Sequence, residues 1–316
     1  MKICVLGAGA LGCAIGGVLT EAGHEVWLVN RNAAQVEAMQ RRGLILRDGG
    51  GDRSVQVHAA TTAQGVNLDT GAVALVIVLV KSFDTRQAMQ DAVSLVGPDT
   101  LVLSLQNGLG HEDILAEIVG RERVLAGKTY AGGTQMGVGH VLVGTRGKDT
   151  HIGELDGRIT ERVQRIADTF NRAGLDTSVS DNIMGTIWDK LLINVATGAL
   201  TGITRLTYGE LYRQPELEAC GVAAVAEAMA VARASGIRLS ITEPRQAWLK
   251  AGAGLPDEFK TSMLQSLEKG SVTEIDFVNG SVVRWGGKCG VPTPVNQTLV
   301  ACIKGIELGL PHSLHH

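Results

Sequence analysis

The sequence has few aromatic residues and no apolar run long enough to cross a membrane. Aromatic residues make up 3% of the 316 positions, whereas 41 positions are glycine. The apolar run at 72–80 has nine residues, far fewer than the roughly 20 that span a bilayer as a helix. Residues 3–20 carry no charge, but their glycines interrupt any signal-peptide core. We therefore predict a protein without a membrane segment, located in the cytoplasm.

Paired cysteines and metal-ligand spacings are also lacking. The five cysteines are odd in number and scattered, without a C-x-x-C pair, so reduced thiols of a cytosolic protein are expected. The eight histidines show no H-E-x-x-H spacing, and three of them lie in the last five residues, which we expect to be frayed. We predict no metal site.

Neither sign of charge is in large excess. The formal net charge is -3 and no long basic stretch occurs, which argues against nucleic acid as the main partner, because phosphate neutralisation needs a concentrated Lys/Arg face. With 45% hydrophobic and 19% charged residues, the composition is typical of a globular α/β protein. A small molecule is the expected partner.

The first half of the chain alternates apolar runs with amphipathic stretches. Strands are expected at 2–6, 25–29, 73–80 and 101–105, with helices that end at 22, span 33–42 and begin at 84. Strands separated by helices predict βαβ units and a parallel sheet. The run 76–80 is continuously apolar, as expected of a strand covered on both faces. Between about 123 and 157, short β-prone runs at 141–143 and 151–153 are expected to extend or edge this sheet.

The second half loses the strand signal. After a helix at 161–173, a strand at 176–179 and capping residues at 180–182, apolar-periodic segments follow at 183–200, 214–235, 242–250, 258–267, 273–287 and 294–308. We predict an N-terminal Rossmann-type, NADP-binding domain at 1–181, followed by an all-helical substrate and catalytic domain at 182–316.

A glycine-rich G-x-G-x-x-G turn follows the first expected strand. The first glycine permits the tight turn, the second lets a pyrophosphate approach, and the third allows close helix–strand contact. The alternative is a merely tight strand-to-helix turn. The residues expected to bind the cofactor are Gly7, Ala8, Gly9, Ala10, Leu11 and Gly12.

The end of the second expected strand indicates which dinucleotide binds. Asn30 and Arg31 stand where an acid would bind a ribose 2′-hydroxyl, and an arginine there accommodates a 2′-phosphate. We therefore predict NADPH. Lys81, directly after the apolar strand, adds a second positive charge at the sheet edge that binds ligands. Both side chains have a plainer interpretation, as solvated turn or strand-end residues.

Three further polar residues suggest a reacting site. Asn107 begins a strand-end turn with Gly108, which is either a simple hairpin turn or a way to present an amide beside the nicotinamide. Lys190 and Asn194 are four apart on one face of an otherwise apolar helix. A buried lysine is costly unless it is paired or functional, although snorkelling from the helix edge is an equal alternative.

With these positions, the sequence resembles the ketopantoate reductase (2-dehydropantoate 2-reductase) family over nearly its whole length. Seven motifs match in order, which is far more specific than any one of them. They are GAGALG at 7–12, VK at 80–81, QNGLG at 106–110, WDKL at 188–191 with Asn194, GEL at 209–211, SMLQ at 262–265 and TEIDFVNG at 273–280.

The resemblance implies reduction of a 2-oxo acid by NADPH, in pantothenate biosynthesis for the family's namesake. By this resemblance Lys190 is the general acid, Glu274 is its partner and contacts a substrate hydroxyl, and Ser262 contacts the substrate carboxylate. Asn107 and Asn194 position the reacting groups. An ammonium beside the carbonyl oxygen stabilises and protonates the charge that hydride addition leaves there. Glu274 has a plainer alternative as a first-turn helix acid.

The sequence departs from the family pattern at two positions. Position 198 is glycine where many members have asparagine, and position 208 is tyrosine where some have asparagine. A reductase of a larger or different 2-oxo acid is therefore an alternative. A non-catalytic NADPH-binding regulator is a more remote one, since fold alone does not fix function. The family habit and the apolar helices also suggest a homodimer.

Overall fold

The computed structural model describes residues 1–69 and 71–311, which form two compact units. Unit 1 comprises Met1–Gln106 and His111–Ile183, and unit 2 comprises Asn107–Gly110 and the chain from Met184 onward. The short segment Asn107–Gly110 thus belongs to unit 2 although it lies within the sequence of unit 1. The tail histidines discussed above lie outside the described residues.

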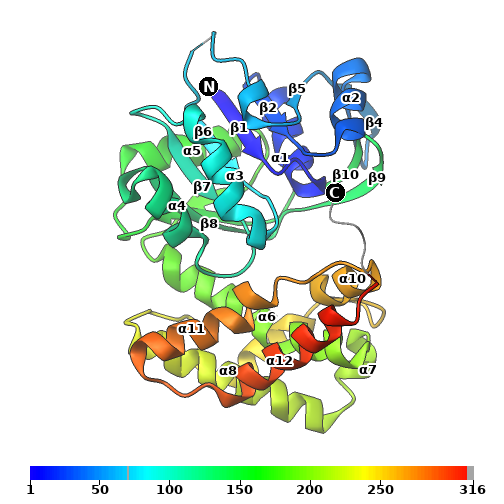
Figure 1. Cartoon of the computed structure of the whole chain (residues 1–316), viewed down its shortest axis with the longest axis vertical. Helices are drawn as coiled ribbons and strands as arrows, with labels where there is room; N and C mark the ends of the chain where they lie inside the picture. The colour runs from blue at the N-terminus through cyan, green and yellow to red at the C-terminus, as the bar shows by residue number, and fades with distance from the viewer. Residues whose placement is uncertain (70, 312–316) are drawn as a thin grey trace. The chain divides into compact units, whose positions relative to one another are not determined.

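Unit 1 contains an eight-stranded sheet whose strands are parallel except for the antiparallel pair β8 and β11. Their order across the sheet is β12 (Thr177–Val179), β11 (Thr150–Glu154), β8 (Val124–Thr129), β7 (Leu101–Ser104), β6 (Leu75–Val78), β1 (Lys2–Leu6), β2 (Glu25–Val29) and β5 (His58–Ala60). The helices of this unit are α1 (Ala10–Glu21), α2 (Ala33–Arg42), α3 (Thr85–Asp91), α4 (His111–Val119) and α5 (Glu161–Arg172) (Figure 1). Short 3-10 helices are η1 (Ala63–Gly65), η2 (Ser82–Asp84), η3 (Val93–Leu95) and η4 (Arg121–Arg123).

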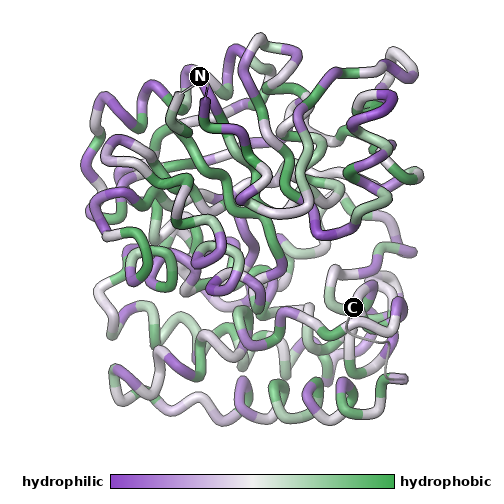
Figure 2. Tube along the Cα trace, turned by 45° about the horizontal axis from the view of Figure 1, so that its top comes forward, coloured by the Kyte–Doolittle hydropathy of each residue, from purple (hydrophilic) through white to green (hydrophobic). Residues whose placement is uncertain are grey.

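Both faces of the sheet are covered, which explains the continuously apolar strand β6. Its Leu75 and Ile77 belong to one buried cluster, and Val76 and Val78 belong to a second cluster. Successive side chains of a strand point to opposite faces, so the two clusters lie on the two sides of the sheet. In Figure 2 the hydrophobic segments of this unit are the green parts of the tube. The predicted Rossmann-type parallel sheet is confirmed.

A second, four-stranded sheet in unit 1 corrects one prediction. Its order is β4 (Gly51–Val55), β3 (Leu44–Asp48), β10 (His140–Gly144) and β9 (Gly132–Gly137). The prediction that residues 141–143 extend or edge the first sheet is wrong, because β10 pairs with β3 and β9 instead. Residues 151–153 do extend the first sheet, as part of β11. A short β-prone run does not specify its partner strand. Here the partner is fixed by packing of Val141 in one core with Leu44 and Leu46.

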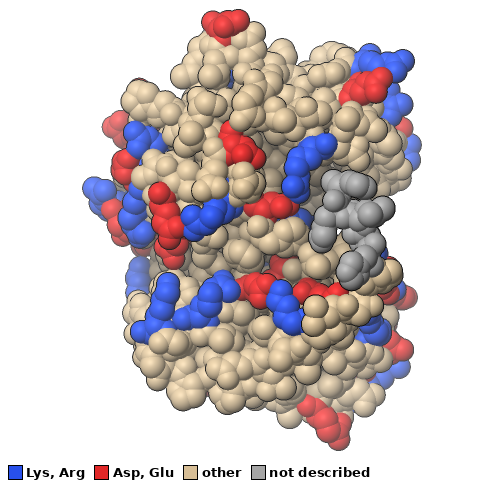
Figure 3. All heavy atoms as spheres, in the orientation of Figure 1, with Lys and Arg blue, Asp and Glu red and all other residues tan. Residues whose placement is uncertain are grey.

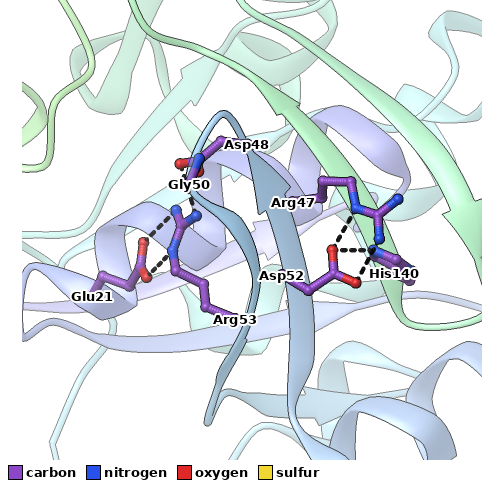
Figure 4. A network of polar contacts seen from close by, with 7 residues as sticks. All are labelled: Glu21, Arg47, Asp48, Gly50, Asp52, Arg53 and His140. Carbon is purple, nitrogen blue, oxygen red and sulfur yellow. Dashed lines mark hydrogen bonds and ion pairs between the residues drawn. The ribbon is translucent and has the colours of Figure 1, made fainter.

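Charged side chains tie the β3–β4 hairpin to its neighbours (Figure 4). Arg53 on β4 forms a two-pronged contact with Glu21 of α1, at 2.5 and 3.0 Å, and donates to Asp48 at 2.8 Å. The guanidinium thereby connects both strands of the hairpin with α1. A second group links the hairpin to β10 and contains Arg47, Asp52 and His140.

Unit 2 is built from helices. They are α6 (Ile183–Thr204), α7 (Tyr208–Leu211), α8 (Pro215–Ala234), α9 (Pro244–Gly252), α10 (Ser262–Glu268), α11 (Asn279–Cys289) and α12 (Pro294–Leu308), with the 3-10 helix η5 (Ile275–Phe277) before α11. α6 is buried along much of its length, and α8 packs against α9, α11 and α12. The predicted helical C-terminal region is confirmed.

Two helices of unit 2 begin later than predicted. The segment 258–267 becomes helical only at Ser262, because the Thr261 side chain caps the helix by accepting from Leu264 N. The segment 273–287 opens as η5, and α11 starts after Val278, whose φ of -104° and ψ of -98° are not helical.

The surface charges are mixed in sign (Figure 3), and the described helices are not of the membrane-spanning kind. On the face drawn in Figure 3, Lys and Arg side chains are interspersed with Asp and Glu side chains. Within residues 1–69 and 71–311, no helix has the length and apolar character needed to cross a membrane.

Candidate functional site

The three glycines of the first turn have different environments. Gly7 has a φ of +96°, and a Cβ there would lie 2.3 Å from Val80 N. A Cβ on Gly12 would lie 2.4 Å from Gly7 O, so the fold itself requires both glycines. Gly9, at the N-terminus of α1, has nothing within 4 Å of a Cβ position. The space beside Gly9 is therefore open for a ligand, as a pyrophosphate at a helix N-terminus requires.

The backbone of this turn is held by the end of β2. Gly7 N and Ala8 N both donate to Val29 O, at 3.1 and 2.9 Å. The Asn30 amide donates to Ala8 O at 2.6 Å and accepts from Asn32 N at 2.9 Å. In the sequence Asn30 stands out only as a position without a carboxylate, whereas in the structure its side chain shapes the turn. Of the other predicted residues in the turn, Ala8 is buried and both Ala10 and Leu11 are partly buried.

The structure brings the end of β2 next to the turn that follows β6. Arg31 binds Asp84 with a distance of 2.6 Å between Nη2 and Oδ2. Asp84 N in turn donates to Lys81 O at 2.8 Å, so Arg31 and the predicted Lys81 lie at one edge of the sheet. The sequence indicates Asp84 only as the start of a helix, because an ion pair between positions 53 residues apart has no local signal.

In unit 2, Lys190 contacts Asn107. Lys190 Nζ donates to Asn107 Oδ1 at 2.7 Å. Lys190 is partly buried on α6, where the following Leu191 and Leu192 are fully buried. A partly buried ammonium is stabilised by such a charge-assisted hydrogen bond. The structure thus joins two residues that were selected independently, from a strand end and from a helix face.

The segment with Asn107 is fixed to unit 2 through Phe277. Leu109 N donates to Phe277 O at 2.9 Å. Gly108 has a φ of +102°, and a Cβ there would lie 2.5 Å from the same carbonyl oxygen. Glycine is therefore required at 108. This contact holds Asn107 where it can accept from Lys190.

Further along α6, the face of Lys190 carries Asn194 and then Gly198. Asn194 is partly buried and Gly198 is buried. A Cβ on Gly198 would meet only Met263 Cε, at 3.7 Å. Side-chain space therefore remains beside this helix turn, on the same face as the two polar residues.

Ser262 and Tyr208 lie on elements that α6 holds in place. Ser262 is exposed at the start of α10, and the preceding Thr261 bonds Thr201 of α6 at 2.6 Å between hydroxyls. The Tyr208 hydroxyl bonds Thr197 of α6 at 2.9 Å. Burial is the main reason that the Tyr208 pKa is raised. Tyr208 thus acts here as a packing residue whose hydroxyl is satisfied within unit 2.

Glu274 lies in the turn that also presents Phe277. Its carbonyl accepts from Phe277 N at 2.9 Å and its side chain is partly buried. Its neighbour Asp276 is engaged elsewhere, by Lys304 at 2.5 Å. Burial alone would lower the Lys304 pKa, but the contact with Asp276 raises it. The pairing of Lys190 with Glu274 stays a prediction.

No group of three or more His, Cys, Asp or Glu side chains arranged to hold a metal ion occurs in the described part of the chain.

Comparison with known families finds two matching models that together cover most of the chain. The model of ketopantoate reductase PanE/ApbA matches residues 3–157, and the model of its C-terminal region matches residues 182–307. A 2-dehydropantoate 2-reductase of Archaeoglobus fulgidus is 33% identical, covering 98% of this chain and 99% of its own. One of Pyrococcus horikoshii is 34% identical, covering 97% and 98%.

Solved structures agree with these matches. A PanE/ApbA family ketopantoate reductase from Ralstonia eutropha JMP134 superposes with a TM-score of 0.88 at 35% identity, covering 99% of this chain and all of that one. A D-mandelate dehydrogenase in a ternary structure with NADH and anilino(oxo)acetate superposes with a TM-score of 0.89 at 29% identity, covering 98% and 99%.

Proposed function

We propose that this chain, which belongs to the ketopantoate reductase family, reduces 2-dehydropantoate to pantoate with NADPH, in pantothenate biosynthesis. It is an oxidoreductase acting on CH–OH groups. The observation that carries the proposal is the 2.7 Å hydrogen bond that presents Lys190 against Asn107. A lysine held in this way on a mostly buried helix is suited to protonate an oxygen.

NADPH is proposed as the cofactor because the turn residues fit a dinucleotide. The open space at Gly9 and the N-terminus of α1 suit the pyrophosphate. Arg31 suits a 2′-phosphate because its guanidinium is positively charged and accessible, with 81% of its side-chain surface exposed. When bound, the reduced nicotinamide supplies the hydride. The proposed cofactor-binding residues are Gly7, Ala8, Gly9, Ala10, Leu11, Gly12, Arg31, Lys81 and Asn107.

The chain's own residues would handle the proton and the substrate. Lys190 Nζ gives a proton to the ketone oxygen as the carbonyl carbon is reduced, and water reprotonates the amine afterwards. Asn107 orients the ammonium through its carbonyl oxygen. Asn194 lies one turn along the same helix face and would bind the substrate. The proposed contacts to the substrate carboxylate and hydroxyl are Ser262 and Glu274.

A direct experiment tests this assignment. Purified protein mixed with NADPH and ketopantoate should lose absorbance at about 340 nm, the reduced nicotinamide band. Lys190→Ala should lose turnover by about 10²- to 10⁴-fold, the usual contribution of a general acid, while it still binds NADPH. Wild-type protein that binds NADPH but reduces no 2-oxo acid would instead indicate the non-catalytic regulator.

The environment of Gly198 supports a second candidate, a reductase of a larger or different 2-oxo acid. Two other buried helical glycines of unit 2, Gly202 and Gly221, have close neighbours that a Cβ would meet. A Cβ would lie 2.8 Å from Ile303 Cδ1 at Gly202 and 2.5 Å from Ala196 O at Gly221. Gly198 has no such neighbour, although glycine within a helix costs about 0.5–1 kcal/mol relative to alanine. The open space is therefore available for substrate atoms.

Gly198→Ala separates the two candidates together with a substrate panel. Gly305 of α12 is an exposed helical glycine with open space, so Gly305→Ala is the matched control for helix propensity. If the space holds a substrate side chain, Gly198→Ala lowers kcat/KM for bulky 2-oxo acids but not for pyruvate, and Gly305→Ala changes neither. The highest wild-type kcat/KM on ketopantoate would reject the second candidate.

The remaining assignments concern domains, assembly and location. We assign dinucleotide binding to residues 1–181 and substrate binding with catalysis to residues 182–316; the start of the C-terminal family match at residue 182 supports this division. We also propose a cytoplasmic homodimer. Light scattering of the purified protein tests the dimer, and a monomer mass would contradict it.

A further inference from the structure

The ion pair between Arg31 and Asp84 has a consequence for the choice of dinucleotide. Arg31 follows β2, where an acid binds a ribose 2′-hydroxyl and an arginine accommodates a 2′-phosphate in this fold. In this chain both groups are present at one place, because Asp84 reaches Arg31 from the turn after β6 at 2.6 Å. Asp84 follows β6, whereas the acid that binds the ribose hydroxyl in this fold usually follows the second strand.

Asp84 has no capping role that would account for its charge. It occupies the N-cap position of α3, but its side chain makes no capping hydrogen bond. Its one side-chain hydrogen bond among the described contacts is the one from Arg31. The Asp84 side chain is 24% exposed and that of Arg31 is 81% exposed. The carboxylate is therefore the fixed partner, and the guanidinium is the accessible one.

We propose that Asp84 is a selectivity-determining residue that weakens the preference for NADPH over NADH. This inference rests on the proposed dinucleotide-dependent function. A 2′-phosphate must share the Arg31 guanidinium with the Asp84 carboxylate and is repelled by it, since both are anions. The 2′-hydroxyl of NADH carries no charge and can donate to a carboxylate. With Arg31 and Asp84 together, the site binds both NADPH and NADH.

The experiment measures dissociation constants for NADPH and NADH by nicotinamide fluorescence, without any 2-oxo acid. The variants are Asp84→Asn, which removes the charge and keeps the shape, and Asp84→Ala as a second form. Asp91→Asn is the matched control, because Asp91 ends the same helix α3 and accepts only from Gln87 at 2.8 Å among its side-chain contacts. Circular dichroism confirms that each variant is folded.

The expected result is at least a fivefold rise in the affinity ratio of NADPH to NADH for both Asp84 variants, with no change for Asp91→Asn. A ratio that is unchanged, or that moves toward NADH, overturns the proposal while leaving the proposed function intact. If the wild-type protein binds neither dinucleotide, the proposed function fails and this proposal fails with it. The two failures are therefore distinct.

Discussion

The ammonium of Lys190 and the amide oxygen of Asn107 are joined by a 2.7 Å hydrogen bond across 83 positions of sequence. The contact lies within unit 2, because the segment around Asn107 is anchored to Phe277 O and belongs to that unit. A flexible lysine side chain is thereby given one direction. We interpret Asn107 as the residue that positions the proton donor.

Asn107→Ala should lower kcat more than it destabilises the protein. Loss of the acceptor leaves the Lys190 ammonium without this fixed direction, and misplacement of a catalytic group costs up to about 10²-fold in rate. We expect a loss of about 10- to 100-fold in kcat, smaller than that of Lys190→Ala, with little change in melting temperature. Steady-state kinetics and thermal melts check this. A loss confined to melting temperature would contradict the positioning role.

Gly7→Ala and Gly9→Ala should affect different properties: the first should lower stability, and the second should lower dinucleotide affinity. A Cβ at Gly7 meets the Val80 backbone at a positive φ, so Gly7→Ala should destabilise the fold by more than about 1 kcal/mol. Gly9 has an ordinary φ of -73° and open space, so Gly9→Ala should fold normally. It should nevertheless lose dinucleotide affinity by at least tenfold. Normal NADPH binding by folded Gly9→Ala would show that no dinucleotide approaches there.

Acid should weaken the contact between Glu154 and Arg162. Burial raises the Glu154 pKa, but hydrogen bonds from Arg162, at 2.7 and 2.5 Å, and from Thr160 outweigh it and lower the pKa. A lowered folded-state pKa stabilises the protein above the unfolded value, about 4.3, and this stabilisation is lost as pH falls through the folded pKa. Glu154→Gln should therefore cost about 1–3 kcal/mol at pH 7 and much less near pH 3.

Thermal or urea unfolding of both proteins at several pH values tests the role of Glu154. The stability difference between wild type and Glu154→Gln should narrow as pH falls below about 4.3. A difference that stays constant down to pH 3 would mean that the carboxylate charge does not contribute. Glu161→Gln, at the exposed start of α5, serves as the control.

The cysteines should differ sharply in reactivity. Burial raises the pKa of Cys4 and of Cys13 to about 12, so almost no thiolate forms at neutral pH. Cys302 is exposed on α12. In a thiol titration of the native protein, Cys302 should react first, and Cys302→Ser should abolish that phase. Cys4 and Cys13 should react only after unfolding; their rapid reaction in the folded state would contradict the described burial.

Regular elements with strong local signals were predicted closely. The helix at 294–308 was predicted with the bounds of α12, because Pro294 occupies the first helical turn, where proline is favoured. Strands β1 and β2 also match, since each is an apolar-rich run followed directly by a helix or turn signal. In contrast, the helix α7 and the hairpin of β3 and β4 were not predicted. Their local signals are short: a capping box of Thr207 and Glu210 starts α7, and an Asp48–Gly turn joins β3 to β4.

The candidate site was predictable residue by residue but not as a set of contacts. The residue types of Lys190 and Asn107 indicated chemistry, yet their hydrogen bond depends on the anchoring of Leu109 to Phe277. Likewise Arg31 indicated a phosphate site, whereas its ion pair with Asp84 depends on the order of strands in the sheet. Such pairings are set by tertiary structure and leave no periodic signal in the sequence.

The most direct test of the central claim is a single assay of wild type and Lys190→Ala with ketopantoate and NADPH. The account predicts that wild-type protein oxidises NADPH only when the 2-oxo acid is present, and that Lys190→Ala binds NADPH equally well but turns over at least 10²-fold more slowly. Equal turnover by the two proteins would contradict the role of Lys190. No oxidation of NADPH or NADH with any 2-oxo acid would contradict the proposed reduction itself.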